Sequence, residues 1–282
     1  EFQREGSANE DFMRPDRVTL GAESEQAIAI MKDIYSALYL IETPFVITSL
    51  ETAEMIKYAA NAFLATKVSF INEIANLCEV MGADVHHVAR AMGLDGRIGK
   101  KFLHPGPGYG GSCFPKDTRA LSRMAHERGY SFKILDAVIR VNEEQKKRMV
   151  SKIMERVGDL KGKTIGILGL SFKPNTNDIR ESSSVVIIQG LLDMGAKVKA
   201  FDPAAMEEAK AVFSEIEYGK DAYDVAKGVD ALVLTTEWNQ FRRLDLQRSK
   251  GLLKKPVFID LRNVYDPDQM KQLGFHYCGV GR

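Results

Sequence analysis

The chain has 282 residues, of which 45% are hydrophobic and 27% are charged, which is enough for one large or two medium-sized domains with filled cores. A net charge of +1 provides no overall field that would favour nucleic acid or a membrane surface. No apolar run reaches the roughly 20 residues of a bilayer-spanning helix, and the N-terminus has no signal-peptide pattern. The three cysteines are too few and too scattered for a disulfide framework, so we expect a cytoplasmic protein.

The first 47 residues predict a loop, a helix over 24–40 and a short strand that ends at Thr48. The opening EFQREG has no methionine and is typical of the interior of a domain. Thr48 and Glu51 form a capping-box pattern ahead of a long helix that runs to about Met81. Gly82 suits the position that follows the end of this helix.

Two polar residues lie within an apolar stripe of this long helix. Lys57 and Asn61 are four residues apart and therefore share a face. At about 100° per residue, the same face carries Leu64, Val68, Ile71 and Ala75. Burying an unpaired ammonium costs on the order of several kcal/mol. Two interpretations stay open: Lys57 reaches along the helix to solvent, or Lys57 and Asn61 together stabilise a developing oxyanion.

A shorter predicted helix, 84–92, leads into the loop GPGYGGS at 106–112, directly before Cys113. Glycines let a backbone approach a ligand closely. A helix is expected to start just after Cys113 and to run over 117–126, and the partial positive charge of its N-terminus favours a nucleophilic thiolate. Asp117 is placed either to cap this helix or to handle a proton. The alternative for Cys113 is a buried structural cysteine beside a tight turn.

After a further helix over 133–157, the pattern changes near Asp159 to alternating strands and helices. LKGKTIGILGLSF is a turn followed by a continuous apolar run, as in a buried parallel strand. A helix over 184–194 and the strand KVKAF complete a βαβ unit. Further strands are predicted at 231–236 and 257–261, with a helical stretch between 204 and 228. The predicted fold class is α/β: a helical module to about residue 158, then a Rossmann-like, doubly wound parallel sheet.

The segment GILGLSFKPNTNDIRESSS, at 166–184, resembles a dinucleotide-binding turn, and Asp202 ends the following strand. It lacks the G-x-G-x-x-G spacing. Lys173, Arg180 and Arg262 follow strand ends, at the sheet edge where open α/β folds bind ligands, so they either bind phosphate or are solvated surface cations. The five histidines have no partners at a zinc-binding spacing, so no metal site is expected.

The motifs GGSCFPKD, KYAANAFLATKVSFINE and FKPNTNDIRES and the opening EFQREG resemble the UDP-glucose and GDP-mannose dehydrogenases. Members of this family are NAD-dependent four-electron oxidants of a sugar primary alcohol. Ser112 and Phe114, on either side of the cysteine, resemble the UDP-glucose branch most. The resemblance therefore implies oxidation of UDP-glucose to UDP-glucuronate. The alternatives are a GDP-mannose substrate, a catalytically silent nucleotide-sugar-binding chain, or an enzyme of the 6-phosphogluconate dehydrogenase type, which has a similar helical domain and needs no cysteine.

The resemblance also implies residue roles. Cys113 matches the nucleophile that forms a thiohemiacetal and then a thioester. Lys57 and Asn61 match residues that hold the reacting oxygens, Asp117 one that orders or deprotonates water, and Glu1 one that acts in hydrolysis. Glu5, Lys116 and Arg180 match contacts to NAD. The implied UDP-sugar contacts are Phe102, Leu103, His104, Pro105, Gly106, Tyr109, Gly110, Lys173, Arg262 and, reaching from a neighbouring subunit, Arg97.

Three regions follow from the resemblance: a remnant of an N-terminal dinucleotide-binding domain (1–47), a central helical and dimerisation domain (48–158) and a UDP-sugar-binding domain (159–282). The family carries G-x-G-x-x-G after a strand in a preceding domain, and in this chain no such motif follows a predicted strand. We therefore expect the chain alone to bind UDP-glucose weakly without turnover. The long helix is expected to form the core of a homodimer or higher homo-oligomer, which would cover its exposed apolar face.

Overall fold

The computed structural model describes residues 2–36, 38 and 43–282. Glu1 and the end of the helix predicted over 24–40 lie outside the described residues. The chain divides into two compact units, Glu1–Phe63 and Leu64–Arg282, each of which is described by itself. None of the described helices is both long enough and apolar enough to cross a membrane.

The first unit contains a two-stranded parallel sheet of β1 (Val18–Gly21) and β2 (Phe45–Thr48). Helices α1 (Ala8–Met13) and α2 (Glu25–Ser36) bury none of their residues, and Val46 and Ile47 of β2 are also exposed. A two-stranded sheet is marginally stable by itself. The first unit therefore leaves much of its apolar surface in solvent.

Helix α3 (Leu50–Met81) begins in the first unit and continues into the second. The predicted capping box at Thr48 is wrong, because Thr48 is still the last residue of β2 and pairs with Gly21. The cap lies one residue later, at Ser49, whose Oγ accepts a hydrogen bond from the Thr52 N–H at 3.3 Å. The predicted inward face of α3 is confirmed at Ile71 and Ala75, which are fully buried.

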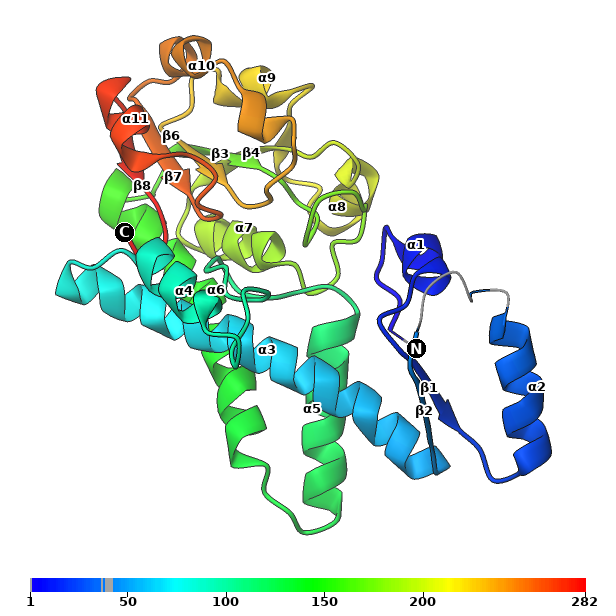
Figure 1. Cartoon of the computed structure of the whole chain (residues 1–282). Coiled ribbons are helices and arrows are strands. Elements are labelled where there is room, and N and C mark those ends of the chain that lie inside the picture. The colour runs from blue at the N-terminus through cyan, green and yellow to red at the C-terminus, as the bar shows by residue number, and fades with distance from the viewer. Residues whose placement is uncertain (1, 37, 39–42) are drawn as a thin grey trace. The chain divides into compact units, whose positions relative to one another are not determined.

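Three more helices complete the helical part of the second unit: α4 (Val85–Leu94), α5 (Cys113–Glu127) and α6 (Lys133–Val157). A short connection joins α5 and α6 into a hairpin (Figure 1). Helix α5 begins at Cys113 itself and its N-cap residue is Ser112. The interpretation of Asp117 as the helix cap is therefore wrong, since Asp117 lies one turn inside the helix.

The sheet of the second unit has six parallel strands in the order β5-β4-β3-β6-β7-β8. They are β3 (Thr164–Leu168), β4 (Lys197–Phe201), β5 (Glu217–Tyr218), β6 (Ala231–Leu234), β7 (Val257–Asp260) and β8 (His276–Cys278). The chain runs outward from β3 to β5, returns to pair β6 with β3, and then runs outward on the other side. This order confirms the predicted doubly wound sheet. Sequence analysis missed the two short edge strands, β5 and β8.

Each face of the sheet has its own apolar core, because side chains alternate along a strand. Ala231 and Val233 of β6 face a core that includes residues of α3, α6 and α7 (Ser183–Asp193). Leu232 and Leu234 face a second core with α9 (Ala222–Ala226) and α11 (Pro267–Gln272). Helices α8 (Met206–Val212) and α10 (Leu246–Leu252) and a 3₁₀ turn (Phe241–Arg243) complete the unit. The helical part therefore shares a core with one face of the sheet.

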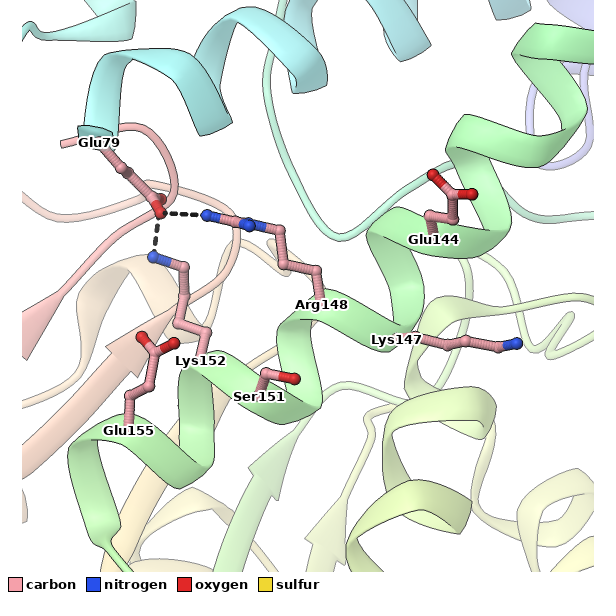
Figure 2. Close-up of a pocket in the computed structure, with 7 residues that line it drawn as sticks. All are labelled: Glu79, Glu144, Lys147, Arg148, Ser151, Lys152 and Glu155. Atoms are coloured by element: carbon pink, nitrogen blue, oxygen red, sulfur yellow. Dashed lines mark hydrogen bonds and ion pairs between the residues drawn. The ribbon is translucent and has the colours of Figure 1, made fainter. Parts of the chain in front are cut away.

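The C-terminal tail returns from β8 to α3 and is held there by Glu79. The Glu79 carboxylate accepts hydrogen bonds from the Gly281 N–H at 2.7 Å and from Lys152 Nζ at 2.7 Å. Arg148 Nη2 lies 3.4 Å from the same carboxylate, and all three side chains line the hollow drawn in Figure 2. Burial opposes ionisation of Glu79, but these hydrogen bonds outweigh it and hold the pKa of Glu79 below its usual value. One carboxylate therefore ties α3, α6 and the tail together.

Because the pKa of Glu79 is lowered by folding, its contribution to stability is present above about pH 4 and is lost as the pH falls through the lowered pKa. We expect Glu79→Gln to reduce the free energy of unfolding at pH 7 by about 2 kcal/mol, since Lys152 then stays buried without its counter-charge. Denaturant titrations at pH 7 and at about pH 2.5, well below the usual pKa of a glutamate, measure this. The Glu79→Gln/Lys152→Met double variant is the control and should recover part of the loss. An equal loss from Glu79→Gln at both pH values would contradict the assignment.

Candidate functional site

The candidate site begins with the loop Phe102–Ser112, most of which is buried. Leu103, Pro105 and Tyr109 are inaccessible or nearly so, whereas His104 is exposed. Side chains from α3, α6 and α7 satisfy much of its main chain: Asn72, Asn142, Gln145 and Ser183. A buried main chain outside a helix or sheet needs such partners. The loop is therefore a fixed part of the fold.

Gly110 and Gly111 make room for the protein's own chain. A Cβ at Gly110 would lie 2.3 Å from the Glu181 carbonyl oxygen, and one at Gly111 would lie 2.7 Å from the Phe172 ring. Gly111 also has a φ of +81° and donates its N–H to the Arg180 carbonyl at 2.8 Å. Sequence analysis related these glycines to the approach of a ligand. The structure shows that the loop also needs them to pack against residues 172–182.

Cys113 is exposed, so the interpretation of it as a buried structural cysteine is wrong. It is the first residue of α5, and its Sγ lies 3.7 Å from Ser112 Oγ. Asp117 follows one turn later on the same helix face. Asp117 is only 3% exposed and pairs with Lys116 Nζ at 2.6 Å. An exposed thiol and a buried, paired carboxylate thus lie on the same face of α5.

The other predicted catalytic residues belong to the first unit. Asn61 is buried, and Lys57 is partly buried with its Nζ 5.3 Å from the centroid of the Phe2 ring. Glu5, a predicted cofactor contact, is exposed. Because Cys113 belongs to the other unit, the convergence of Lys57, Asn61 and Glu5 on the thiol stays a prediction.

Lys116 and Arg180, the other predicted cofactor contacts, line one open hollow beside the start of α5. Arg180 pairs with Asp178 at 2.8 Å, and this pair keeps the pKa of Asp178 below its usual value although burial opposes it. Arg119, which sequence analysis missed, lines the same hollow and pairs with both carboxylate oxygens of Glu181, which lowers the pKa of Glu181. The hollow is therefore lined by three cations that each pair with a carboxylate: Lys116 with Asp117, Arg119 with Glu181, and Arg180 with Asp178.

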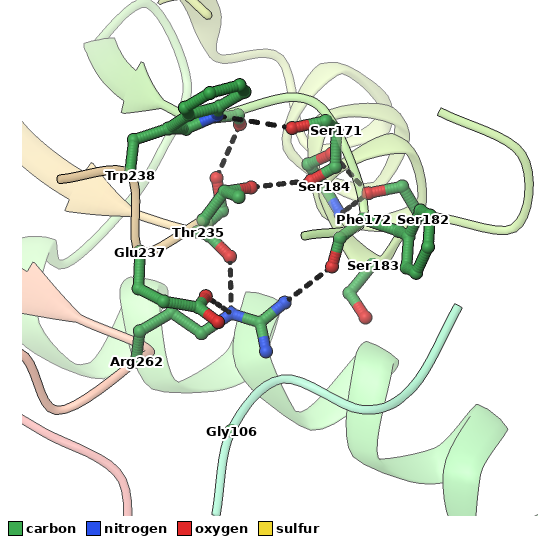
Figure 3. A network of polar contacts seen from close by, with 12 residues as sticks. Gly106, Ser171, Phe172, Ser182, Ser183, Ser184, Thr235, Glu237, Trp238 and Arg262 are labelled. Carbon is green, nitrogen blue, oxygen red and sulfur yellow. Dashed lines mark hydrogen bonds and ion pairs between the residues drawn. The ribbon is translucent and has the colours of Figure 1, made fainter. Parts of the chain in front are cut away.

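Arg262 follows β7 and crosses to the point where the strand order reverses, between β3 and β6 (Figure 3). Its Nε donates to the Thr235 carbonyl at 2.8 Å and lies 3.1 Å from Glu237 Oε2. Its Nη2 donates to the Phe172 carbonyl at 3.1 Å. A Cβ on Gly106 would lie 3.4 Å from Arg262 Nη1. The arginine therefore lies between the carboxyl edge of the sheet, where open α/β folds bind ligands, and the loop that leads to Cys113.

Asp202 is used by the protein itself. Its carboxylate is fully buried and accepts hydrogen bonds from the main chain of Leu170 and Ser171 and from Trp238 Nε1 at 2.7, 3.0 and 3.1 Å. In a dinucleotide-binding turn, an acid at this place binds a ribose. The structure therefore gives no support to a dinucleotide site at this turn. Glu237, which pairs with Arg262, and Trp238, which donates to Asp202, were not predicted as site residues from the sequence. Their positions directly after the apolar run ALVLTT were the signal that could have identified them.

The remaining predicted contacts lie around this edge. Lys173 Nζ lies 5.3 Å from the centroid of the neighbouring Phe172 ring. Phe102 has a φ of +65° and its ring lies 6.0 Å from that of Phe114. Arg97 pairs with Asp95 at 2.6 Å and is otherwise exposed to solvent. Among the residues that the structure describes, no three His, Cys, Asp or Glu side chains gather in a way that could hold a metal ion.

Two family profiles match the chain in sequence order. Residues 51–144 match the central domain of the UDP-glucose/GDP-mannose dehydrogenase family, and residues 166–267 match the UDP binding domain of the same family. The two matches cover the long helix, the cysteine loop and most of the doubly wound sheet.

Individual relatives agree with the profiles. The UDP-glucose 6-dehydrogenase of Rhizobium meliloti (strain 1021) is 48% identical and that of Bacillus subtilis (strain 168), TuaD, is 49% identical; both matches cover the whole chain. The solved structure of a UDP-glucose dehydrogenase from Pyrobaculum islandicum superimposes with a TM-score of 0.90 at 41% identity and also covers the whole chain. The chain spans 65%, 61% and 62% of the lengths of these three proteins. The chain belongs to the UDP-glucose/GDP-mannose dehydrogenase family.

Proposed function

We propose that this chain is the substrate-binding and thiol-bearing part of an NAD-dependent UDP-glucose 6-dehydrogenase. One observation carries the proposal: the largely buried loop Phe102–Ser112 passes beside Arg262 at Gly106 and ends at the exposed Cys113. Arg262 lies at the carboxyl edge of the sheet, and Cys113 begins α5. Such a loop can place a nucleotide at the sheet and the far end of its sugar at a nucleophile. The names of the relatives support UDP-glucose as that substrate.

In this proposal Arg262 and Lys173 bind the UDP group, because both are cations at the carboxyl edge of the sheet. The loop segment Phe102–Gly106, with Tyr109 and Gly110, contacts the rest of the UDP-sugar. Burial raises the pKa of Tyr109, so its hydroxyl stays neutral. Arg97 is exposed and is proposed to reach the site of a neighbouring subunit.

The phosphate-bearing part of NAD is proposed to bind at the hollow that Lys116 and Arg180 line, because that hollow is rich in cations. Glu5, which belongs to the other unit, is proposed as a further contact to NAD. When it is bound, NAD accepts a hydride from C6 of the sugar in each of two oxidations. The Cys113 thiolate adds to the aldehyde carbon that the first oxidation leaves, and the resulting tetrahedral alkoxide can expel the second hydride. Water then cleaves the thioester, which releases the carboxylate and returns the thiol.

The other predicted residues assist at the oxygens. Lys57 and Asn61 are proposed to hold the reacting oxygen of C6 and to stabilise its negative charge. Asp117, one turn from Cys113 on the same helix face, is proposed to order or deprotonate the water that attacks the thioester. Glu1, which lies outside the described residues, is proposed to act in the same hydrolytic step.

A homodimer or higher homo-oligomer through α3 is part of the proposal. Phe70, Leu77, Val80 and Met81 of this helix are between 48% and 79% exposed, and Leu94 of α4 is also exposed. Contiguous apolar side chains of this size on a helix surface mark an association site. A second copy of the chain is the proposed occupant.

A second candidate is a catalytically silent chain that binds a nucleotide sugar. No described strand is followed by a G-x-G-x-x-G turn, because the run with this spacing, GPGYGG at 106–111, comes after α4. This favours the candidate for the chain by itself. Binding of UDP-glucose without NADH formation is its expected behaviour.

The proposal predicts about two NADH per UDP-glucose when the chain is extended at its N-terminus to the length of its relatives, and much less NADH with GDP-mannose. Cys113→Ser should lower kcat by at least about 10³-fold, because the second oxidation has no thiohemiacetal to act on. Following the absorbance of NADH measures both quantities. Cys78→Ser, at a buried cysteine of α3, is the matched control and should keep most of the activity. Full activity of Cys113→Ser would instead favour chemistry of the 6-phosphogluconate dehydrogenase type.

The association surface makes a separate prediction. We expect Phe70→Glu/Leu77→Glu to convert the oligomer into monomers, because two carboxylates would be desolvated at the interface. Sedimentation velocity measures the change in mass. The control is Val212→Glu, which places a carboxylate at an exposed apolar residue of α8 and should leave the mass unchanged. An unchanged mass for the α3 variant would show that copies associate elsewhere or not at all.

A further inference from the structure

Buried side-chain amides hold the loop Phe102–Ser112 at two separate points. The Gly106 N–H donates to Asn72 Oδ1 at 2.8 Å, and the Gly106 carbonyl accepts from Gln145 Nε2 at 2.9 Å. The Tyr109 N–H donates to Asn142 Oδ1 at 2.8 Å, and the Tyr109 carbonyl accepts from Asn142 Nδ2 at 3.1 Å. Each amide therefore replaces a main-chain partner that the loop lacks.

Asn142 and Gln145 lie one turn apart on α6 and are each only 2% exposed. Asn76 Nδ2 donates to Gln145 Oε1 at 2.8 Å, so the orientation of the Gln145 amide is set. Gly108, with a φ of +107°, lets Asn142 approach, because a Cβ there would lie 3.0 Å from Asn142 Oδ1. Helix α6 therefore holds both ends of the segment 106–109 through hydrogen bonds.

The two residues that α6 holds, Gly106 and Tyr109, lie beside different parts of the proposed site. Gly106 lies beside Arg262, at the edge of the sheet. The Tyr109 ring packs edge-on against Phe114 with centroids 5.8 Å apart, and Phe114 is in the first turn of α5, next to Cys113. A shift of Gly106 therefore reaches the nucleotide end, and a shift of Tyr109 reaches the thiol end.

We propose that Asn142 and Gln145 are positioning residues with separate tasks: Asn142 sets the place of the Cys113 thiol, and Gln145 sets the place of the UDP-sugar contacts at Gly106. This proposal rests on the proposed function of the loop. A buried carbonyl that loses its donor keeps the penalty of its desolvation, which favours a shift of the loop. A displacement of about 1 Å of a reacting group can cost about 10²-fold in rate.

The test uses Asn142→Asp and Gln145→Glu in the N-terminally extended protein. Each substitution keeps the size of the side chain and replaces the amide donor by an oxygen that repels the loop carbonyl, so each variant is a matched control for the other. We expect Asn142→Asp to lower kcat at least tenfold with little change in KM for UDP-glucose. We expect Gln145→Glu to raise KM and the Kd of UDP-glucose at least tenfold with little change in kcat.

Ser69→Ala controls for packing between α3 and α6, because Ser69 Oγ donates to the Val138 carbonyl and does not hold the loop. Unfolding titrations of all variants separate lost stability from lost positioning. The proposal is overturned if both variants change kcat and KM alike, or if both lose only stability, as Ser69→Ala should.

A second readout does not depend on turnover. The rate at which iodoacetamide alkylates Cys113, followed by mass spectrometry, should change at least threefold in Asn142→Asp and stay unchanged in Gln145→Glu. Equal rates in the two variants would contradict the division of tasks. If the protein without substitutions formed no NADH, only the proposed function would fail. The separate tasks of Asn142 and Gln145 would still be tested, because the alkylation of Cys113 needs no turnover.

Discussion

The site depends on one constraint: the loop Phe102–Ser112 is buried without a helix or a sheet to satisfy its main chain. Buried N–H and C=O groups must find partners or lose the free energy of their hydration. Here amide side chains from α3 and α6 provide the partners at Gly106 and Tyr109. The same hydrogen bonds that stabilise the fold therefore fix the path of the loop from Gly106, which lies beside Arg262, to Cys113.

Charge reinforces this constraint around the loop. Lys146 of α6 is completely buried, and a Cβ on Gly108 would lie 3.2 Å from its Cγ. The Lys146 Nζ is 2.9 Å from the carboxylate of Glu143 and 3.9 Å from that of Glu181. Glu181 in turn pairs with Arg119 of α5. A buried ammonium is tolerated only when carboxylates accompany it. These ion pairs therefore link α6 and α5 through the segment that covers the cysteine loop.

Local pattern was enough to predict the parts of the fold that are locally determined. The apolar runs of β3, β6 and β7 predicted strands buried on both faces, and the spacing of residues on α3 predicted its inward face at Ile71 and Ala75. The edge strands β5 and β8 are two and three residues long, so they leave no periodic signal. The cap of α3 was assigned one residue too early, because only the pairing of Thr48 with Gly21 shows where β2 ends.

The site was predictable only in part. Cys113, Lys116 and Arg180 stood out through their neighbours in the sequence and the family resemblance, and the structure brings Lys116 and Arg180 to one hollow. Asn142 and Gln145 lie in the charged run VNEEQKK, which reads as a solvated helix face. Their role arises from contacts with a loop more than thirty residues away in the sequence. No pattern along the chain reports such a contact.

We propose that the loop Phe102–Ser112 places the nucleotide of the substrate at the edge of the sheet and its sugar at the Cys113 thiol. The most direct test measures the alkylation rate of Cys113 by iodoacetamide in the N-terminally extended protein, with saturating UDP-glucose and with saturating UDP. We expect UDP-glucose to slow the reaction at least tenfold and UDP, which lacks the sugar, to slow it far less. Equal protection by both ligands, or protection by neither, would contradict the placement of the sugar at Cys113.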